Sequence, residues 1–168
     1  MIFIALGSSV GDAENTFNSA QLWLEQHGLQ VIKKSTNLNN PPCGGVAQND
    51  FTNAVWQIEF LETKWEQINW CLLPQRRRWH LKAKKLLNLL QQCENAHGRV
   101  RTKRWDDRTL DLDILQFHQL QYCSKKLKIP HPEIPKRVFV LQPWSEIVDE
   151  DFCIPKFGRL TELLTHLN

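Results

Sequence analysis

Short runs of apolar residues predict four β-strands. They are Ile2–Leu6, Leu29–Leu38, Phe51–Phe60 and Thr109–Phe117. The first is a continuous apolar run, typical of a strand buried on both faces, and a loop over residues 7–11 is expected after it. The last alternates apolar and polar side chains, which indicates one face in the core and one face open to solvent or a ligand.

Helical periodicity predicts two longer helical regions between these strands. In the first region, apolar residues recur every three or four positions between Asp12, a good N-cap, and Gly28, a good stop. The second region, Lys64–Gly98, carries a similar apolar stripe, and Pro74 is expected to divide it into two helices. Residues 39–45, rich in Asn, Pro and Gly, predict a loop.

The element order β-α-β-β-α-β predicts an α+β fold of the ferredoxin-like (split βαβ) type, with helices packed on an antiparallel sheet. A smaller C-terminal part follows, with a hairpin near Leu120–Leu127, a turn at residues 130–132 and helices near Lys136–Trp144 and Leu160–Leu167. We expect all 168 residues to form one domain, because two separate cores would each fall near the lower size limit.

The composition is that of a globular protein, with 42% hydrophobic and 23% charged residues, and it excludes a disordered chain. No apolar run is long enough to cross a bilayer, and Met1 leads into the first strand without a basic leader, so no secretory signal is expected. Five widely spaced cysteines predict free thiols in a reducing cytoplasm, since their number is odd and no C-x-x-C pair occurs.

Charge is unevenly distributed along the chain. The net charge is +3, but the segment from Lys64 to Arg108 holds 12 Lys and Arg against 4 Asp and Glu, and the remainder holds 9 against 14. Such a concentration of cations indicates an anionic ligand, such as phosphate groups, nucleic acid or an acidic surface. A solvated helix face is the alternative interpretation.

Asp111 and Asp113 are the first candidate site. On a strand these two side chains share one face with their Cα atoms about 7 Å apart, while the intervening apolar residues anchor the other face. Two carboxylates this close repel each other unless a cation lies between them, and Mg²⁺ takes one or two carboxylates together with substrate phosphates. The alternative is a half-exposed strand whose aspartates pair with nearby lysines.

A basic loop precedes this strand. Five cations fall between Arg99 and Arg108, more than two aspartates can neutralise, which favours a metal-bridged polyphosphate gripped by guanidinium groups. Trp105 among these charges indicates packing on a ligand or on an arginine stem. His131 and Arg137 are further candidate phosphate contacts, although a lone histidine is more often structural.

Phosphate-binding signatures of other enzyme classes do not occur in the sequence. There is no P-loop, no dinucleotide-binding G-x-G-x-x-G and no protein-kinase signature. A phosphoryl-transfer enzyme with this sequence therefore uses a different scaffold.

Seven motifs together resemble one known family. They are Ala5-Leu6-Gly7-Ser8-Ser9, Pro41-Pro42-x-Gly44, Gln48-x-Asp50-Phe51-x-Asn53-Ala54-Val55, Gly98-Arg99-Val100-Arg101, Arg104-Trp105-x-x-Arg108-Thr109-Leu110-Asp111-Leu112-Asp113-Ile114, Pro130-His131-Pro132 and Arg137-x-Phe139-x-Leu141-x-Pro143. In this order, and over nearly the whole chain, they resemble the 6-hydroxymethyl-7,8-dihydropterin pyrophosphokinases. The resemblance implies a ferredoxin-like enzyme of folate biosynthesis that transfers the pyrophosphoryl group of ATP to the pterin hydroxymethyl oxygen and releases AMP.

The resemblance also implies which residues contact the nucleotide. Asp111 and Asp113 would hold two Mg²⁺ ions that bridge the ATP phosphates and the attacking hydroxyl. Arg99 and Arg108 would be the catalytic arginines of a mobile loop that closes over the triphosphate. The other residues assigned to ATP are Gln91, Glu94, Arg101, Trp105, Ile114, His131 and Arg137.

For the pterin, the resemblance implies that Asn53 reads the ring edge while Phe51 and Phe139 enclose the flat ring. The remaining edge contacts are assigned to backbone groups of Asn40, Pro41 and Cys43. Without the resemblance, core packing would be the preferred interpretation of the two phenylalanines.

The sequence departs from the family pattern at several positions. Ser9 stands where asparagine is usual, Asn40 where threonine is frequent, and Asp106 and Asp107 add negative charge beside Arg108. These departures leave open a weakly active paralogue that binds the substrates but turns them over slowly.

Residues 64–86 form a family-atypical insertion with three tryptophans and a run of cations. One interpretation is an amphipathic helical hairpin with its basic face in water, and the other is a site for a partner or a nucleic acid. A ferredoxin-like nucleic-acid-binding module is therefore the rival function, although the RNP1 pattern of such modules is absent. Family likeness favours a monomer.

Overall fold

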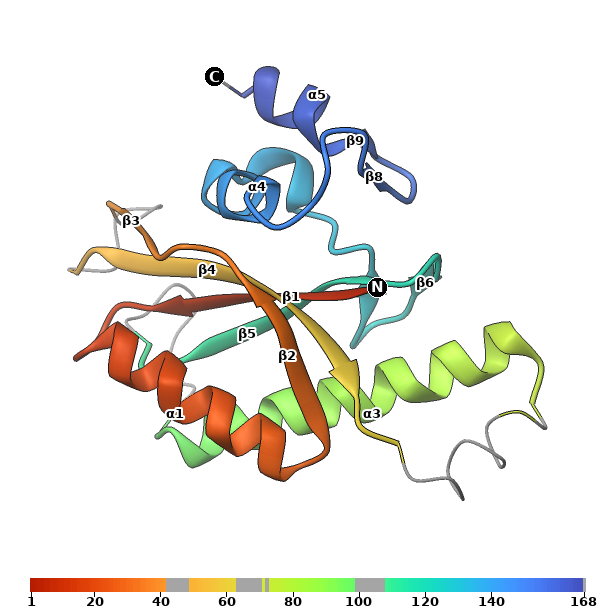
Figure 1. The fold of residues 1–168 in the computed structure, drawn as a ribbon, viewed down its shortest axis with the longest axis horizontal. Coiled ribbons are helices and arrows are strands. Elements are labelled where there is room, and N and C mark those ends of the chain that lie inside the picture. The colour runs from red at the N-terminus through yellow and green to blue at the C-terminus, as the bar shows by residue number, and fades with distance from the viewer. Residues whose placement is uncertain (42–48, 63–70, 72, 99–107, 168) are drawn as a thin grey trace.

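The computed structural model describes residues 1–41, 49–62, 71, 73–98 and 108–167 (Figure 1). In chain order its elements are β1 (Ile2–Ser8), α1 (Ala13–Gln26), β2 (Leu29–Lys34), β3 (Leu38–Asn40), β4 (Phe51–Phe60), α3 (Gln75–Ala96), β5 (Asp111–Phe117), β6 (Tyr122–Cys123), β7 (Lys128–Ile129), the 3-10 helix η1 (Ile134–Lys136), α4 (Val138–Ser145), β8 (Cys153–Ile154), β9 (Gly158–Arg159) and α5 (Leu160–Thr165). None of the helices described here is both long and apolar enough to span a membrane.

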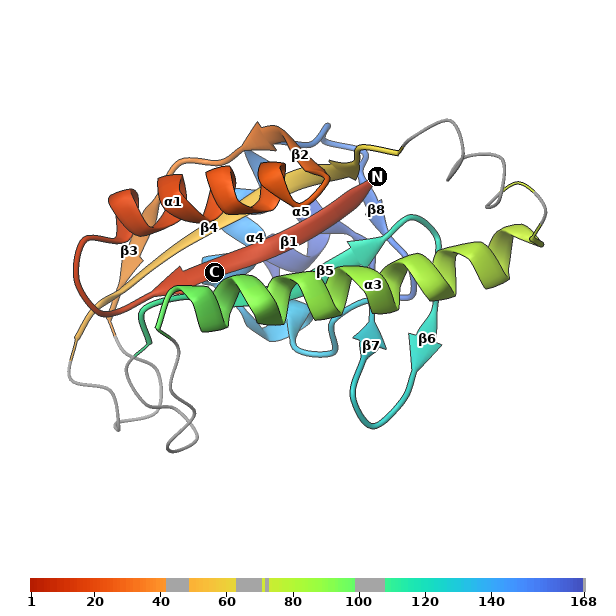
Figure 2. The same ribbon diagram turned by 90° about the horizontal axis from the view of Figure 1, so that it is seen from below.

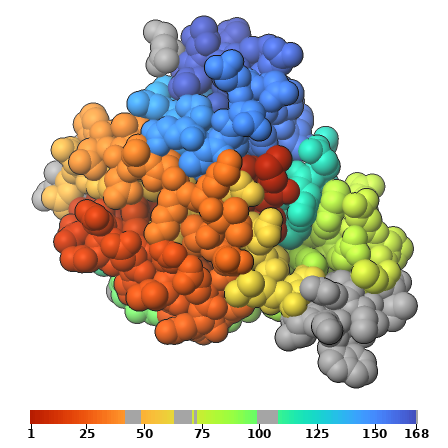
Figure 3. Space-filling view, viewed as in Figure 1, coloured from red at the N-terminus to blue at the C-terminus, as the bar shows by residue number. Residues whose placement is uncertain are grey.

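The main sheet is antiparallel, with the strand order β2-β4-β1-β5 and the short β3 paired to the start of β4. Helices α1 and α3 cover one face of the sheet, and α4 and α5 lie over the other (Figures 1 and 2). The space-filling view shows the C-terminal segment and the α1 segment on opposite sides of the molecule (Figure 3). The predicted α+β class, an antiparallel sheet with packed helices, is confirmed.

Helices on both faces explain why β1 is apolar at every position from Ile2 to Leu6. Ile2, Ile4 and Leu6 belong to the core under α1 and α3. Phe3 points the other way, into the core under α4, where its ring lies 5.1 Å from the ring of Trp144. A strand covered on both faces needs apolar side chains at every position, rather than at alternate ones.

Local signals in the sequence account for the ends of the helices. The Asp12 side chain accepts the Asn15 N–H at 3.0 Å and caps α1, and Gly28 takes φ +82° just after that helix ends. Pro74 immediately precedes α3, as predicted, because a proline lacks the N–H that a position in the interior of a long helix would use. The other helix predicted in Lys64–Gly98 lies largely outside the described residues.

Three boundaries differ from the prediction. Gly7 and Ser8, expected in a loop, continue β1 because they pair with Asn53 and Thr52 of β4. The predicted strand Leu29–Leu38 is two strands, because the regular pairing with β4 is interrupted between Lys34 and Leu38. At the interruption the Ser35 N–H donates to the Val55 carbonyl, and Ser35 Oγ accepts the Val55 N–H.

Asn39 and Asn40, also expected in the loop, form part of β3 opposite the first residues of β4. The C-terminal hairpin pairs Tyr122 with Ile129, so it extends beyond the predicted range of Leu120–Leu127. The β8–β9 hairpin was not predicted at all, because its two-residue strands carry no periodic pattern.

Within the segment 64–86, the structure describes residues 71 and 73–86, of which residues 75–86 form the first half of α3. Ala83 and Leu86 enter the core, whereas Arg76, Arg77 and Lys84 are exposed. This segment therefore has the amphipathic character that was expected of a helix covering the sheet.

Candidate active site

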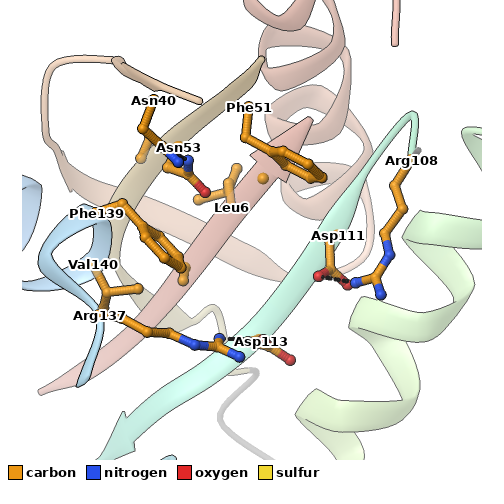
Figure 4. A pocket seen from close by; sticks show the side chains of 13 residues that line it. Leu6, Asn40, Phe51, Asn53, Arg108, Asp111, Asp113, Arg137, Phe139 and Val140 are labelled. Atoms are coloured by element: carbon orange, nitrogen blue, oxygen red, sulfur yellow. Dashed lines mark hydrogen bonds and ion pairs between the residues drawn. The ribbon is translucent and has the colours of Figure 1, made fainter. Parts of the chain in front are cut away.

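A pocket lies between the sheet and the start of α4, on the sheet face opposite α1 and α3 (Figure 4). Its lining comes from β1, β3, β4, β5 and α4: Ala5, Leu6, Gly7, Asn40, Phe51, Asn53, Ala54, Arg108, Asp111, Asp113, Arg137, Phe139 and Val140. Eight of the predicted site residues are in this list. Four of them were assigned to the pterin and four to the nucleotide. The fold thus gathers them from positions up to a hundred residues apart.

The strand register brings the polar side chains together. Gly7 of β1 pairs with Asn53 of β4 on one side and with Asp111 of β5 on the other. Two residues before Gly7 on β1, Ala5 pairs with Asp113. Because glycine and alanine leave space at the centre, the amide on β4 and the carboxylates on β5 border one common cavity.

Two amides form the end of the pocket farther from Asp111. Asn53 is 8% exposed, and its Nδ2 donates a hydrogen bond to Oδ1 of Asn40, whose own Nδ2 donates to the Pro41 carbonyl at 3.2 Å. These bonds fix the orientation of both carboxamides, so the Asn53 Oδ1 and its second N–H are left to the cavity.

Gly7 permits this arrangement. A Cβ atom at position 7 would lie 3.4 Å from Asn53 Oδ1 and 3.9 Å from the Asp111 side chain. A side chain at position 7 would therefore contact the amide and the carboxylate and occupy the floor of the pocket between them.

Two aromatic side chains project into the pocket from different layers, Phe51 from the sheet and Phe139 from α4 (Figure 4). Both are half-buried, and the guanidinium of Arg137 lies 5.7 Å from the centre of the Phe139 ring. An apolar slot bordered by amide groups suits a flat heterocycle with polar edges.

The other end of the pocket is formed by carboxylates paired with arginines. Asp111 Oδ2 contacts the Arg108 guanidinium at 2.5 Å, and Asp113 Oδ2 lies 3.6 Å from that of Arg137. Among the described residues, arginines pair with these two aspartates, rather than the lysines of the alternative interpretation. Each carboxylate is only partly exposed, at 24% and 39% of its side chain. A ligand can therefore reach both.

His131 stands beside this carboxylate pair as a neutral donor. Its Nδ1 accepts the Glu133 N–H at 3.3 Å, so in the neutral ring the proton sits on Nε2, 3.9 Å from Asp113 Oδ2. Burial lowers the pKa of His131 below its ordinary value, against an opposing effect of Asp113. The imidazole is consequently uncharged at neutral pH.

Three further residues assigned to ATP, Gln91, Glu94 and Ile114, do not line the pocket. Glu94 of α3 is 2% exposed, and its Oε1 accepts the Leu112 N–H at 2.8 Å. Since β5 is an edge strand, this bond satisfies a backbone donor that no neighbouring strand reaches. Gln91 is half-buried one turn earlier, and Ile114 is a core residue at 4% exposure.

Pro41 is exposed and does not line the cavity, although its carbonyl anchors Asn40. Cys43, Arg99, Arg101 and Trp105 lie outside the described residues. Sequence reasoning did not assign Leu6, Ala54 and Val140 to the site, because apolar residues in strands and helices resemble ordinary core. Gly7 was quoted in a motif, and its place after an apolar strand was the available signal.

Residues 3–149 match the family model described as 7,8-dihydro-6-hydroxymethylpterin-pyrophosphokinase (HPPK). The chain is 36% identical over 149 residues to the 2-amino-4-hydroxy-6-hydroxymethyldihydropteridine pyrophosphokinase of Bacillus subtilis, covering 88% of this chain and 78% of that protein. It is 33% identical over 163 residues to the enzyme of that name from Haemophilus influenzae, covering 96% and 89%. With the one from Pseudomonas aeruginosa the identity is 30% over 164 residues, covering 97% and 89%.

Proposed function

The chain belongs to the 7,8-dihydro-6-hydroxymethylpterin-pyrophosphokinase family, and on this premise we propose that the pocket beside α4 joins ATP and 6-hydroxymethyl-7,8-dihydropterin. As a pyrophosphokinase of folate biosynthesis, it moves the pyrophosphoryl group of ATP to the pterin hydroxymethyl oxygen and releases AMP. One observation carries the assignment of this pocket. A slot lined by rings and amides and a carboxylate–arginine cluster border the same cavity (Figure 4).

The slot is proposed to hold the pterin. Phe51 and Phe139 cover the two faces of the ring, and Asn53 offers an acceptor and a donor to its edge. Asn40 holds the Asn53 amide in that orientation, and backbone groups of Asn40, Pro41 and Cys43 complete the edge contacts. The hydroxymethyl group then points along the row of Gly7 toward Asp111.

The carboxylate–arginine cluster is proposed to receive the triphosphate. Arg108 and Arg137 each neutralise an aspartate in the structure. When ATP arrives, both guanidinium groups transfer to phosphate oxygens, which match their planar donors better than a single carboxylate oxygen does. His131 donates its Nε2–H to the same phosphates. Arg99, Arg101 and Trp105 close over the nucleotide, with Gln91, Glu94 and Ile114 on its adenosine side.

The donor set at Asp111 and Asp113 fits magnesium. Both ligands are hard carboxylate oxygens on one strand face, and among the residues that the structure describes no cluster of three or more His, Cys, Asp or Glu occurs. A pair of carboxylates that leaves most of the coordination to phosphate oxygens and water is what Mg²⁺ takes in nucleotide sites. Two bound Mg²⁺ ions would neutralise the phosphates and stabilise the entering and leaving oxygens.

The chain's own residues then set the geometry of transfer. The hydroxymethyl oxygen forms a bond to the β-phosphorus, the bond from that phosphorus to the α-phosphate oxygen breaks, and the hydroxyl proton is released. Arg108 and Arg137 balance the charge on the transferred group. Covering the site excludes water, which would otherwise compete with the alcohol.

The whole chain is proposed to form one ferredoxin-like domain that acts as a monomer. The strand order β2-β4-β1-β5 supports the split βαβ description, because β4 lies between β1 and β2 and α1 connects those two strands. Within this domain, residues 64–86 are proposed to be an insertion that is atypical of the family.

The test is an assay of AMP release from ATP, Mg²⁺ and 6-hydroxymethyl-7,8-dihydropterin. We expect AMP only when all three are present. Asp111→Asn and Asp113→Asn should each lower kcat by on the order of 10³-fold, since the isosteric amide cannot hold the cation. Asp149→Asn, at an exposed position outside the pocket, is the matched control and should leave kcat unchanged.

Unchanged turnover in both pocket variants would place the reaction elsewhere on the molecule. An unmeasurable rate in the wild-type protein, with both substrates still bound, would identify the weakly active paralogue. The nucleic-acid-binding alternative is not favoured by the family relationship. In the part of the chain that the structure describes, helices cover both faces of the sheet, which leaves neither face free to stack on bases as sheet-based RNA-binding modules do.

A further inference from the structure

A second cavity lies between α3 and the β6–β7 hairpin, whose strands run across the direction of that helix (Figure 2). Its volume is about 340 Å³. Three lysines and three apolar side chains define it, and we refer to it as the lysine groove: Lys84, Lys125, Lys126, Leu87, Tyr122 and Leu127. It is separate from the proposed active site, because the two cavities share no lining residue.

The walls of the lysine groove are held by contacts within the fold. The Tyr122 ring meets the His80 ring edge-on with the centres 4.2 Å apart, which ties the hairpin to α3. In the turn of the hairpin, Ser124 Oγ accepts the N–H groups of Lys126 at 3.3 Å and Leu127 at 3.1 Å. The turn therefore presents two lysines at a fixed position on the rim.

The lysine groove has apolar atoms beneath and cations above. Leu127 is 8% exposed and Leu87 and Tyr122 are half-buried, whereas all three lysines are exposed. Among the described residues, no acidic side chain forms an ion pair with Lys84, Lys125 or Lys126.

The two elements that form the lysine groove carry mostly positive charge. The only acid within Gln75–Ala96 is Glu94, which is buried against β5, and residues 119–129 contain none. Glu62, which lies outside these two elements, pairs with Lys82 of α3. Arg76 and Arg77 add exposed cations in the first turn of α3, where the helix dipole opposes them. These cations do not stabilise the helix, and a binding partner with negative charge would account for them.

The apolar atoms of the lysine groove lie below its lysines, and this arrangement decides which of three partners fits: a bilayer surface, a single-stranded nucleic acid or a peptide. A bilayer surface cannot enter a groove whose apolar floor lies below exposed lysines. Single-stranded nucleic acid needs a ring to stack on, but the Tyr122 ring packs on His80 and the nearby Trp79 ring on His118 at 5.1 Å. A peptide can place apolar side chains on the floor and carboxylates against the rim.

We propose that the lysine groove is a docking site for an acidic peptide segment of a partner protein, with apolar side chains that enter the floor and carboxylates that meet Lys84, Lys125 and Lys126. This mode combines apolar anchors with charge complementarity at the rim. It does not depend on the reaction at the other site.

The test is fluorescence anisotropy of the full chain with a short fluorescein-labelled peptide that carries leucines at helical spacing and glutamates between them. We expect saturable binding that weakens as salt is raised. A peptide with glutamine for glutamate and one with serine for leucine should each bind about tenfold more weakly or worse. The pyrophosphokinase rate should be the same with and without bound peptide.

Two charge reversals of equal size separate the lysine groove from general charge. Lys125→Glu should weaken peptide binding about tenfold, because it replaces attraction by repulsion. Arg159→Glu, at an exposed position on β9, should not. Both variants should keep the wild-type unfolding midpoint and turnover.

Several results would overturn the proposal: no saturable binding, equal loss in both variants, or equal binding of the serine-substituted peptide. Tighter binding of an oligothymidylate or of phosphatidylserine vesicles, lost in Lys125→Glu, would assign the lysine groove to those ligands instead. Salt-sensitive self-association that Glu150→Lys abolishes would identify the acidic run Asp149–Asp151 of a second copy as the occupant.

Discussion

Ser9 and Arg108 exchange two hydrogen bonds where β1 ends and the approach to β5 begins. The Ser9 N–H donates to the Arg108 carbonyl at 2.9 Å, and the Arg108 N–H donates to Ser9 Oγ at 2.9 Å. This pair fixes the backbone of the arginine whose guanidinium meets Asp111. A serine at this position, where the family usually has asparagine, thus still provides a polar side-chain contact.

We expect Ser9→Ala to lower the free energy of unfolding by about 1 kcal/mol, because the Arg108 N–H loses its acceptor. Turnover should fall several-fold as Arg108 becomes less well placed. Urea unfolding and steady-state kinetics measure the two effects, and Ser9→Thr, which keeps the hydroxyl, should restore most of both. Wild-type behaviour of Ser9→Ala would show that the pair does not position Arg108.

Arg108→Ala should lower kcat on the order of 10²-fold, since it removes a group that balances charge on the transferred phosphates. Arg108→Lys should recover only part of this loss, because an ammonium cannot form two parallel bonds to a phosphate. Arg159→Ala, an exposed arginine of β9, is the control. Unaltered kcat in Arg108→Ala would remove this residue from the catalytic assignment.

Gly7→Ala should raise the KM for the pterin about tenfold while leaving the KM for ATP nearly unchanged. The added Cβ would lie 3.4 Å from Asn53 Oδ1, and one methyl group in a tight pocket costs at least about tenfold in specificity. Initial-rate kinetics with each substrate varied in turn measure the split. A rise in the KM for ATP alone would show that ATP, and not the pterin, binds beside Gly7.

Glu94 tests whether a buried carboxylate supports the strand that carries the aspartates. Glu94→Ala should lower the free energy of unfolding by about 2 kcal/mol, because the Leu112 N–H loses a charged acceptor. Glu94→Gln keeps an oxygen acceptor and should lose less. If Glu94→Ala were as stable as wild type and raised only the KM for ATP, the residue would serve the nucleotide rather than the strand.

His118 predicts a dependence of stability on pH. Burial, together with the nearby charges of the N-terminal ammonium, Lys82 and Arg78, lowers its pKa to about 4. The native histidine therefore stays neutral while that of the unfolded chain protonates near 6.5, so stability falls as the pH drops from about 6.5 toward 4. Urea midpoints across this range measure the fall.

The control for this titration is His118→Asn. His118 has φ +49°, a left-handed conformation that asparagine tolerates better than most residues. The variant should unfold at a midpoint that changes less between pH 6.5 and pH 4 than that of wild type. An identical pH dependence in both proteins would show that another group controls it.

Local patterns in the sequence were sufficient for the elements that carry the site. The Asp12 cap, the stop at Gly28 and the start after Pro74 concern neighbouring residues, so they were readable without the fold. The shared face of Asp111 and Asp113 follows from strand geometry alone. The motif order was enough to indicate the family.

The two-residue alternation of a strand did not predict which face each side chain of β5 lies on, because the pairing with a distant strand sets the register there. β5 pairs with β1 through a bulge, so Leu115 enters the core under α4 while Phe117 returns to the core under α1 and α3. A strict two-residue period would have placed both on one face. The bulge depends on the partner strand, which no local pattern describes.

The sequence by itself determined which residue types are available for this chemistry and on which elements they lie. Only the tertiary structure decided that Gly7 opens a space between Asn53 and Asp111, that Arg108 and Arg137 balance the two aspartates, and that Glu94 is bonded to the backbone of β5. The physical reason is that helical and strand periods are set by neighbouring residues, whereas strand register, ion pairing and burial are set by residues far apart in the chain.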